Sequence, residues 1–391
     1  MASDNTKYHN FGYEIFGSFL FGFTQWLRER ILANGDKKIF FFSRDGYLMQ
    51  KAYYLFEEQL PLGLEQYYVY FSRNSLRRGL LWHCNGYEES LKYLSKERFT
   101  EFAEIASYYG LEKKELDPLI NKIGLGWNEN LLFDKLSENS RVRKVYDEFK
   151  DVIFDRSHTQ YDTVITYLKQ IGMKGKCAIV DIGWHGTMQY YLEQLIETAG
   201  LDIHVNGYYV GTNPIKPHKG KSEGYLYNEG NLLLRKSVLC FLGGYEKLFQ
   251  SLEGSTDGYT TEGDKVVPLL KPYEYEDDCE IQSYVQDLQT GALDYVRQGV
   301  GNHLMFDNKR DAYSKLIRFG KSPSYTETQM FRFFYIADGG RSYFLPQKSI
   351  LRYSPKEFML ALSNSVWKTG FLKAAFWLPF PYYWIYNLIR K

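Results

Sequence analysis

The sequence predicts an α/β protein built on a parallel sheet, and two observations indicate this. The apolar run Ile39–Phe42 is short and unbroken, as in a strand buried on both faces, and it runs straight into Ser43, Arg44 and Asp45. The stretch Cys177–Thr212 has the pattern of a strand, a glycine-containing loop, a helix and a second strand, which is a βαβ unit. Open α/β sheets bind ligands at the carboxyl ends of their strands, so these three polar residues are expected to line a site.

Length and composition narrow the classes of protein. The 391 residues suffice for two or three domains, and the net charge of +1 creates no field that would attract nucleic acid. Aromatic residues make up 18% of the chain, which suits carbohydrate or membrane surfaces, although an AT-rich genome would also produce it. The four cysteines are scattered and predict neither a zinc site nor disulfides. The N-terminus has no apolar signal core, so we expect a cytoplasmic protein.

The order of elements predicts five regions. A helix over residues 11–32 precedes the first strand, and a second strand over residues 67–71 ends in Ser72 and Arg73. From about residue 87 the periodicity is helical, and strands resume near residue 177. The regions are the first part of the α/β core (1–86), a helical cap insert (87–170), the second part of the core (171–260), an accessory, mainly helical lobe (261–367) and a membrane-interface anchor (368–391).

Two neighbouring strands deliver hydroxyl and guanidinium groups to one edge, which suits a phosphate. Arg44 and Arg73 are expected to clamp it, or else to form salt bridges with Asp45 or Asp181 in the empty site. Ser72 either binds the phosphate or caps the next helix.

The third strand ends in a loop that also suits an anion. Asp181 is followed by Gly183, Trp184, His185, Gly186 and Thr187, which places backbone N–H groups at a helix N-terminus. The alternative is a tight turn whose glycines serve only its geometry. His185 can be a general acid, a phosphate ligand or a structural histidine. Further along, Glu246 and the polar stretch 248–259 are candidates for contacting a sugar, or form an ordinary surface loop.

Several motifs together resemble the haloacid dehalogenase-like (HAD-like) superfamily. They are FFFSRDGYLMQ, YVYFSRNSLR, VDIGWHGTMQ, GYYVGT and EKLFQSLEGSTDGY, and they are similar to those of HAD-like proteins from bacterial surface-polysaccharide clusters for capsule and O-antigen. The resemblance implies a Rossmann-like sheet with a cap. It also implies that Asp45 is the acid/base, that Ser72 binds the transferring phosphoryl group, that Lys174 or Lys176 is the catalytic lysine and that Asp181 binds Mg²⁺.

The chain departs from that superfamily at Ser43, where the nucleophilic aspartate should stand. A serine without an adjacent base is a poor nucleophile, so aspartyl-phosphate chemistry is not expected. The change also removes one magnesium ligand and leaves Asp45 and Asp181 as the candidate pair.

The segment 371–389 is apolar and aromatic, with prolines at 379 and 381, and Arg390 and Lys391 follow it. It is barely long enough to span a bilayer, and its Trp, Tyr, Lys and Arg residues favour a position in the membrane interface. The alternative is a helix packed on the protein's own core or on a partner.

These observations favour sugar transfer from a phosphate-activated donor, nucleotide- or phospho-sugar, to a lipid-linked glycan at the inner membrane face. A HAD-type sugar-phosphate phosphatase or phosphotransferase is the alternative enzyme. A non-catalytic subunit of a glycan synthase is the third hypothesis.

Overall fold

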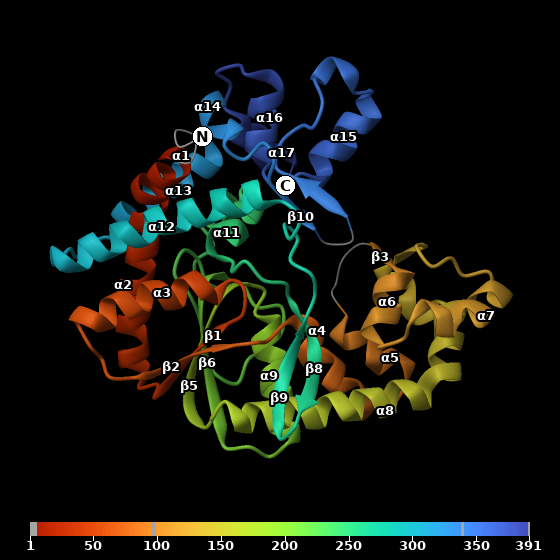
Figure 1. The fold of residues 1–391 in the computed structure, drawn as a ribbon. Coiled ribbons are helices and arrows are strands. Elements are labelled where there is room, and N and C mark those ends of the chain that lie inside the picture. Colours follow the sequence, from red (N-terminus) through yellow and green to blue (C-terminus); the bar gives the residue numbers. More distant parts are fainter. Residues whose placement is uncertain (1–5, 95–98, 338–339, 390–391) are drawn as a thin grey trace.

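The computed structural model describes residues 6–94, 99–337 and 340–389. Within these residues the largest sheet has five strands, all parallel, in the order β2-β1-β5-β6-β7 (Figure 1). The strands are β1 (Lys38–Phe42), β2 (Glu65–Val69), β5 (Gly175–Trp184), β6 (Ile203–Thr212) and β7 (Ser222–Gly224). The predicted α/β class and parallel sheet are therefore confirmed, and the first four of these strands match the strands that the sequence predicts.

Both faces of the sheet are buried, as the unbroken apolar strand predicts. Side chains alternate along β1, so Ile39 and Phe41 enter one hydrophobic cluster while Phe40 and Phe42 enter the other. Helices cover the first face: α1 (Thr6–Phe11), the π-helical turn η1 (Gly12–Phe16), α2 (Gly17–Asn34), α3 (Gly46–Gln59), α12 (Cys279–Gly301) and α13 (Lys309–Lys321). The second face is covered by α4 (Arg73–Arg77), η2 (Arg78–His83), α8 (Ser140–Gln170) and α9 (Thr187–Thr198).

The insert between β2 and β5 is largely helical but also contains an antiparallel strand pair. Its elements are α5 (Tyr87–Ser90), η3 (Leu91–Tyr93), β3 (Phe99–Glu101), α6 (Phe102–Tyr108), α7 (Lys113–Ile123), β4 (Asn130–Leu132) and η4 (Phe133–Glu138). Strands of three residues are too short to show an alternating pattern, which explains why the periodicity of this region predicts helices alone. The 31 residues of α8, roughly 46 Å of helix, link the insert to the sheet (Figure 1).

The chain after β6 returns to the core before it forms a C-terminal lobe. The elements α10 (Arg235–Leu239) and α11 (Leu242–Phe249) lead to a hairpin of β8 (Thr256–Glu262) and β9 (Lys265–Leu270), so the expected polar loop 248–259 is in part helix and strand. The helix α12 then packs against α1, η1, α2 and α3. The C-terminal lobe comprises α14 (Tyr325–Gln329), β10 (Tyr335–Ala337), β11 (Arg341–Tyr343), η5 (Ile350–Arg352), α15 (Pro355–Asn364), α16 (Lys368–Phe376) and α17 (Tyr382–Ile389).

Close backbone contact joins the N-terminal helices to α12. A methyl group on Gly12 would lie 1.9 Å from the carbonyl oxygen of Leu288, and one on Gly291 would lie 2.0 Å from that of His9. Only glycine permits such an approach. The N-terminal helices and α12 are thus packed closely together over one face of the sheet.

Candidate functional site

The candidate site lies where the direction of the sheet's connections reverses. From β1 the chain crosses to β2 on one side and later returns to β5 on the other side of β1. The crevice outside the carboxyl ends of two such strands is the usual ligand site of an open α/β sheet. Asp45 follows β1 as the N-cap residue of α3, and Asp181 lies near the end of β5. The topology therefore places both carboxyl groups at one edge of the sheet, as the sequence predicts.

Three carboxyl groups interact at this edge of the sheet, which we call the crevice after its place in the topology. Burial raises the pKa of Asp45 well above its ordinary value, and the negative charges of Asp181 and Glu246 raise it further. Burial likewise raises the pKa of Glu246. A hydrogen bond of 3.2 Å that Trp184 Nε1 donates to Glu246 Oε1 opposes this by favouring the ionised form. The sequence predicts Glu246 only as a sugar contact. The structure places it beside the two aspartates, on α11.

Asp181 is a deeply buried member of the three, with 4% of its surface exposed. Burial raises its pKa to about 6, although the backbone N–H groups of Ile182 and Gly183 and the charge of Arg73 favour the ionised form. One carboxyl oxygen, Oδ1, is buried without a hydrogen-bond partner among the described residues. A buried polar atom left in this way is a place where a ligand atom, a water or a cation is expected.

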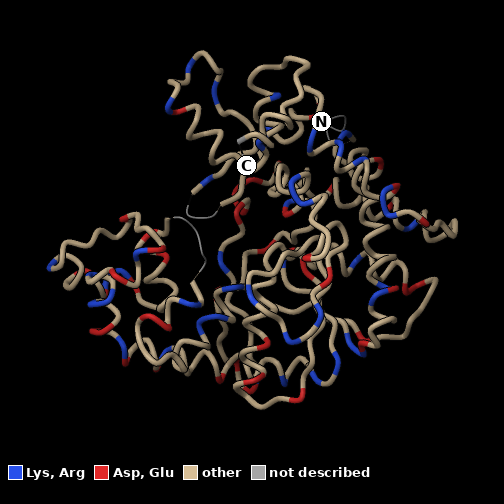
Figure 2. The backbone as a smooth tube through the Cα atoms, turned by 180° about the vertical axis from the view of Figure 1, so that it is seen from behind, with Lys and Arg blue, Asp and Glu red and all other residues tan. Residues whose placement is uncertain are grey.

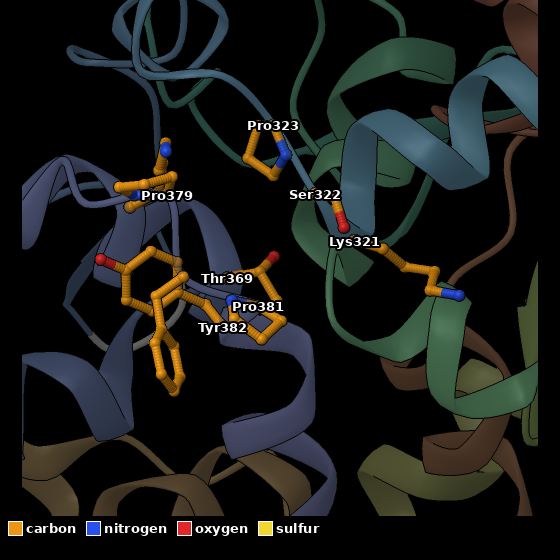
Figure 3. Close-up of a pocket in the computed structure, with 9 residues that line it drawn as sticks. Lys321, Ser322, Pro323, Thr369, Pro379, Pro381 and Tyr382 are labelled. Atoms are coloured by element: carbon orange, nitrogen blue, oxygen red, sulfur yellow. The ribbon is translucent and has the colours of Figure 1, made fainter.

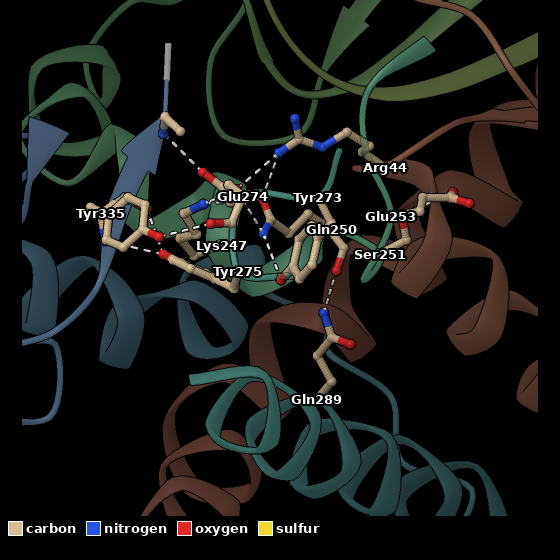
Figure 4. A network of polar contacts seen from close by, with 11 residues as sticks. Arg44, Lys247, Gln250, Ser251, Glu253, Tyr273, Glu274, Tyr275, Gln289 and Tyr335 are labelled. Carbon is tan, nitrogen blue, oxygen red and sulfur yellow. Dashed lines mark hydrogen bonds and ion pairs between the residues drawn. The ribbon is translucent and has the colours of Figure 1, made fainter. Parts of the chain in front are cut away.

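Arg73 and Arg44 both lie near the three carboxyl groups, but among the described residues only Arg44 has hydrogen-bond partners. Arg73 is the first residue of α4, is exposed, and makes no hydrogen bond or ion pair with any residue that the structure describes, although its charge favours ionisation of Asp181 and Glu246. Arg44 instead donates to Gln250 Oε1 at 2.8 Å and to Glu274 Oε1 at 3.3 Å (Figure 4). The expected salt bridges of Arg44 with Asp45 or Asp181 are therefore replaced by one with Glu274. The guanidinium of Arg73 is still available to an anion.

A buried polar network that the sequence does not predict surrounds Arg44 (Figure 4). Lys247, 2% exposed, forms an ion pair with Glu274, which also accepts from the backbone N–H of Ala337 at 2.9 Å. Burial lowers the pKa of Lys247 to about 8, and its charge lowers the pKa of Asp45. The only sign of a buried lysine in the sequence is its position directly before the apolar pair Leu248-Phe249 on a short helix. Its acidic partner is 27 residues away.

The predicted loop Gly183–Thr187 is in fact the end of β5, which includes Gly183 and Trp184, followed by the start of α9, and its conformation accounts for its glycines. Gly183 and Gly186 have φ of +98° and +63°, and a methyl group on Gly183 would meet the carbonyl oxygen of Gly211 at 2.7 Å. Trp184 also has a positive φ, +68°, which is costly for a residue with a side chain. Thr187 opens α9, and His185 is exposed, with a pKa lowered by partial burial and by the charges of Arg235 and Arg73. The turn interpretation thus explains the glycines, while ligand binding by the loop stays a prediction.

The two serines at the strand ends are engaged in structural hydrogen bonds. Ser43 is buried, and its Oγ lies 3.2 Å from the carbonyl oxygen of Phe71 and 3.3 Å from Thr256 Oγ1. Ser72 Oγ accepts from the backbone N–H of Ser75 at 3.0 Å and forms a capping box with it. The capping interpretation of Ser72 is confirmed, and no side chain among the described residues acts as a base on the hydroxyl of Ser43.

The expectation that Lys174 or Lys176 is a catalytic lysine is wrong. Lys176 is the second residue of β5 and Asp181 is the seventh, so they stand five residues apart, roughly 16 Å along an extended strand. Parallel strands put their amino ends at the edge opposite the crevice. There these two lysines line a cavity of about 540 Å³ together with Lys37, Lys38 and Lys169.

The fit of Mg²⁺ to the crevice rests on two carboxylates. No group of three or more His, Cys, Asp or Glu suited to a metal occurs among the described residues. Magnesium commonly takes only one or two carboxylates and completes its shell with water and substrate phosphate. Asp45 and the unpartnered Oδ1 of Asp181 fit that smaller donor set. A Mg²⁺ ion held with a bound phosphate stays a prediction on these two residues.

Comparison of the chain with models of known protein families, and with curated proteins, finds no match.

The raised pKa of Asp181 predicts that Asp181→Asn stabilises the fold at high pH only. Below about pH 4 the group is protonated in both folded and unfolded chains, so it costs nothing. As pH rises from about 4 to 6 the unfolded chain loses the proton first, and the native state loses stability. Above pH 6 the cost is complete, roughly 2–3 kcal/mol, and asparagine removes it. Urea unfolding at pH 4 and pH 8 measures this difference.

The matched control is Asp202→Asn, at an exposed aspartate on the opposite edge of the sheet. It should change stability by no more than about 0.5 kcal/mol at either pH. A loss of stability in Asp181→Asn at pH 8 would show that the ionised carboxylate is instead stabilised by its surroundings.

Proposed function

We propose that the crevice between β1 and β5 binds the phosphate of an activated sugar donor, and that the chain transfers the sugar to a lipid-linked glycan in bacterial surface-polysaccharide biosynthesis. The observation that supports this most is the group of three interacting carboxyls, Asp45, Asp181 and Glu246, beside the exposed guanidinium of Arg73. An arginine suits a phosphate, and a carboxyl with a raised pKa suits proton transfer near neutral pH. The resemblance to HAD-like proteins of capsule and O-antigen clusters supports the substrate class.

In this proposal the residues divide the work between the donor and the acceptor. Arg73 neutralises the leaving phosphate, and Gly186 and Thr187, at the start of α9, supply backbone N–H groups beside it. Asp45 removes the proton from the attacking hydroxyl, because its raised pKa makes the ionised form a better base than an exposed aspartate. Asp181 lies close enough to raise that pKa. In the alternative, Asp45 and Asp181 would share a Mg²⁺ ion that supplies charge neutralisation at the donor phosphate, and Asp45 would then not be the base.

Covalent phosphatase chemistry has less support, because the position of the expected nucleophile is Ser43. Its hydroxyl is buried against Phe71 and Thr256, and none of the described residues places a base on it. A HAD-type phosphatase and a non-catalytic donor-binding subunit are the two alternative outcomes of the experiments below.

Arg73→Ala is expected to weaken binding of inorganic pyrophosphate by roughly 10- to 150-fold, because a charged hydrogen bond contributes about 1.5–3 kcal/mol. Isothermal titration calorimetry with pyrophosphate measures the loss. Arg297→Ala, at an exposed arginine paired with Asp294 on α12, is the matched control and should bind as the wild type does. Equal affinity of Arg73→Ala and wild type would place the anion elsewhere and remove the main support for this function.

A further inference from the structure

The C-terminal lobe exposes an unusual number of large apolar side chains. They lie on the turn between α16 and α17, on α17 itself, and on η5 and α15. Trp377 is 71% exposed and Leu351 is 93% exposed. The others that are exposed are Phe376, Leu378, Phe380, Trp384 and Leu388 beside Trp377, and Met359 and Leu360 on α15. We call this set the apolar face. Exposed apolar side chains gathered in one part of a protein often mark an interaction site.

The apolar face stands on a rigid support. Trp367, fully buried, stacks on Phe319 and donates its Nε1–H to the carbonyl oxygen of Gly320 at 2.9 Å. The hydroxyl of Tyr383 lies 2.9 Å from Ser237 Oγ, so this tyrosine is held to the core. Phe358 on α15 packs on Phe376 with ring centroids 5.9 Å apart, which joins the two parts of the face. The segment is therefore in part core, as the alternative interpretation of residues 371–389 expects, and in part exposed surface, for which the membrane interpretation stays a prediction.

The charge around the apolar face is positive. Residues 344–389 contain five basic residues, Lys348, Arg352, Lys356, Lys368 and Lys373, and one acidic residue, Glu357. Figure 2 shows this lobe as the part of the chain that carries mainly Lys and Arg. The expected contribution of Arg390 and Lys391 lies outside the described residues. Because the whole chain is almost neutral, this local excess is a property of the lobe.

A cavity of about 310 Å³ opens beside the turn between α16 and α17 (Figure 3). Pro379, Phe380 and Pro381 line it together with Lys373, whose Nζ donates to the carbonyl oxygen of Leu378 at 3.0 Å. Lys321 extends away from the two prolines in Figure 3, and its Nζ lies 4.5 Å from the ring centroid of Tyr383. Two cations, Lys321 and Lys373, thus line the cavity beside the aromatic turn.

We infer that the apolar face docks on an anionic phospholipid bilayer. Exposed Trp and Phe beside Lys and Arg are the residues that occupy the boundary between headgroups and acyl chains, and basic residues are attracted to anionic lipid. No helix among the described residues is long and apolar enough to cross a membrane, which leaves insertion parallel to the surface. A protein partner fits less well, because protein interfaces are depleted in lysine. This inference stands independently of the proposed sugar transfer.

The test is sedimentation of the full chain with vesicles of phosphatidylcholine, with and without phosphatidylglycerol. Wild type should pellet with the anionic vesicles and be released by salt. The variant Trp377→Ser, Phe380→Ser, Trp384→Ser should bind them at least roughly tenfold more weakly. Its control is Leu32→Ser, Tyr54→Ser, Leu60→Ser. This variant changes three comparably exposed apolar residues on α2, on α3 and at the end of α3, outside the C-terminal lobe. Deletion of residues 371–391 is a poor test, because it would remove buried Phe371 and Tyr386.

A second set of variants tests how much the basic residues contribute to vesicle binding. Arg352→Glu with Lys356→Glu should weaken binding to anionic vesicles, while Lys174→Glu with Lys176→Glu, at the basic cavity on the far edge of the sheet, should not. Failure of wild type to pellet, equal losses in test and control variants, or a face that instead pairs two copies of the chain in gel filtration would each overturn the inference. Circular dichroism melting checks that every variant is folded.

Discussion

Asp45→Asn is expected to fold and to bind pyrophosphate as the wild type does, while sugar transfer falls by roughly 10²–10⁴-fold. Asparagine keeps the shape of the side chain but cannot take a proton from the acceptor hydroxyl. The assay is release of nucleoside diphosphate from a panel of nucleotide sugars in the presence of a polyprenyl-linked glycan. Because the pKa of Asp45 is raised, the wild-type rate should fall as pH drops through that raised value.

Asp264→Asn, in the exposed turn between β8 and β9, provides the control and should leave the rate unchanged. Two results would contradict the assignment. Transfer by Asp45→Asn at the wild-type rate would make the chain a binding subunit or move the base elsewhere. Rapid hydrolysis of p-nitrophenyl phosphate by wild type, with a trapped phospho-enzyme, would establish a phosphatase.

Lys247→Met should destabilise the fold by about 3–5 kcal/mol, because it leaves the carboxylate of Glu274 buried with only part of its charge compensated. Glu274 has 7% of its side chain exposed, and Arg44, at 3.3 Å, is the other cation on it. That second cation places the expected loss toward the lower end of the range. Urea unfolding at pH 7 gives the free energy.

The double variant Lys247→Met, Glu274→Gln should recover most of the loss, since it removes both charges and keeps the volume. Lys348→Met breaks an exposed ion pair with Glu357 and should cost at most about 1 kcal/mol. If the double variant is as unstable as the single one, packing around Lys247 matters more than its charge. Binding of pyrophosphate to the double variant would then report how far this pair holds Arg44 in place.

The parts of the site that follow strands directly can be predicted from the sequence. An unbroken apolar run must be buried on both faces, and parallel strands bring their carboxyl ends to one edge, so the sequence pattern alone places Asp45 and Asp181 together. Arg73 follows from the same argument for β2. For Ser72 the pattern leaves two roles open, and the hydrogen bond to Ser75 shows one of them.

The remaining parts depend on contacts between distant segments, which local patterns do not encode. Lys247 and Glu274 meet through the path of the chain between α11 and α12, and Glu246 reaches the aspartates through the same packing. The prediction for Lys174 is wrong because a residue that precedes a strand lies at the opposite end of that strand from the crevice. The apolar face depends on tertiary packing as well, since a run of aromatic residues does not reveal which side chains enter the core.

The raised pKa values of the three carboxyl groups also mean that the crevice can hold protons close to neutral pH. Close to neutral pH they cannot all be ionised at low cost, because Asp181 and Glu246 both raise the pKa of Asp45, and Glu246 also raises that of Asp181. An incoming phosphate adds negative charge and raises these pKa values further, so binding of an anion is expected to be accompanied by proton uptake and to weaken as pH rises.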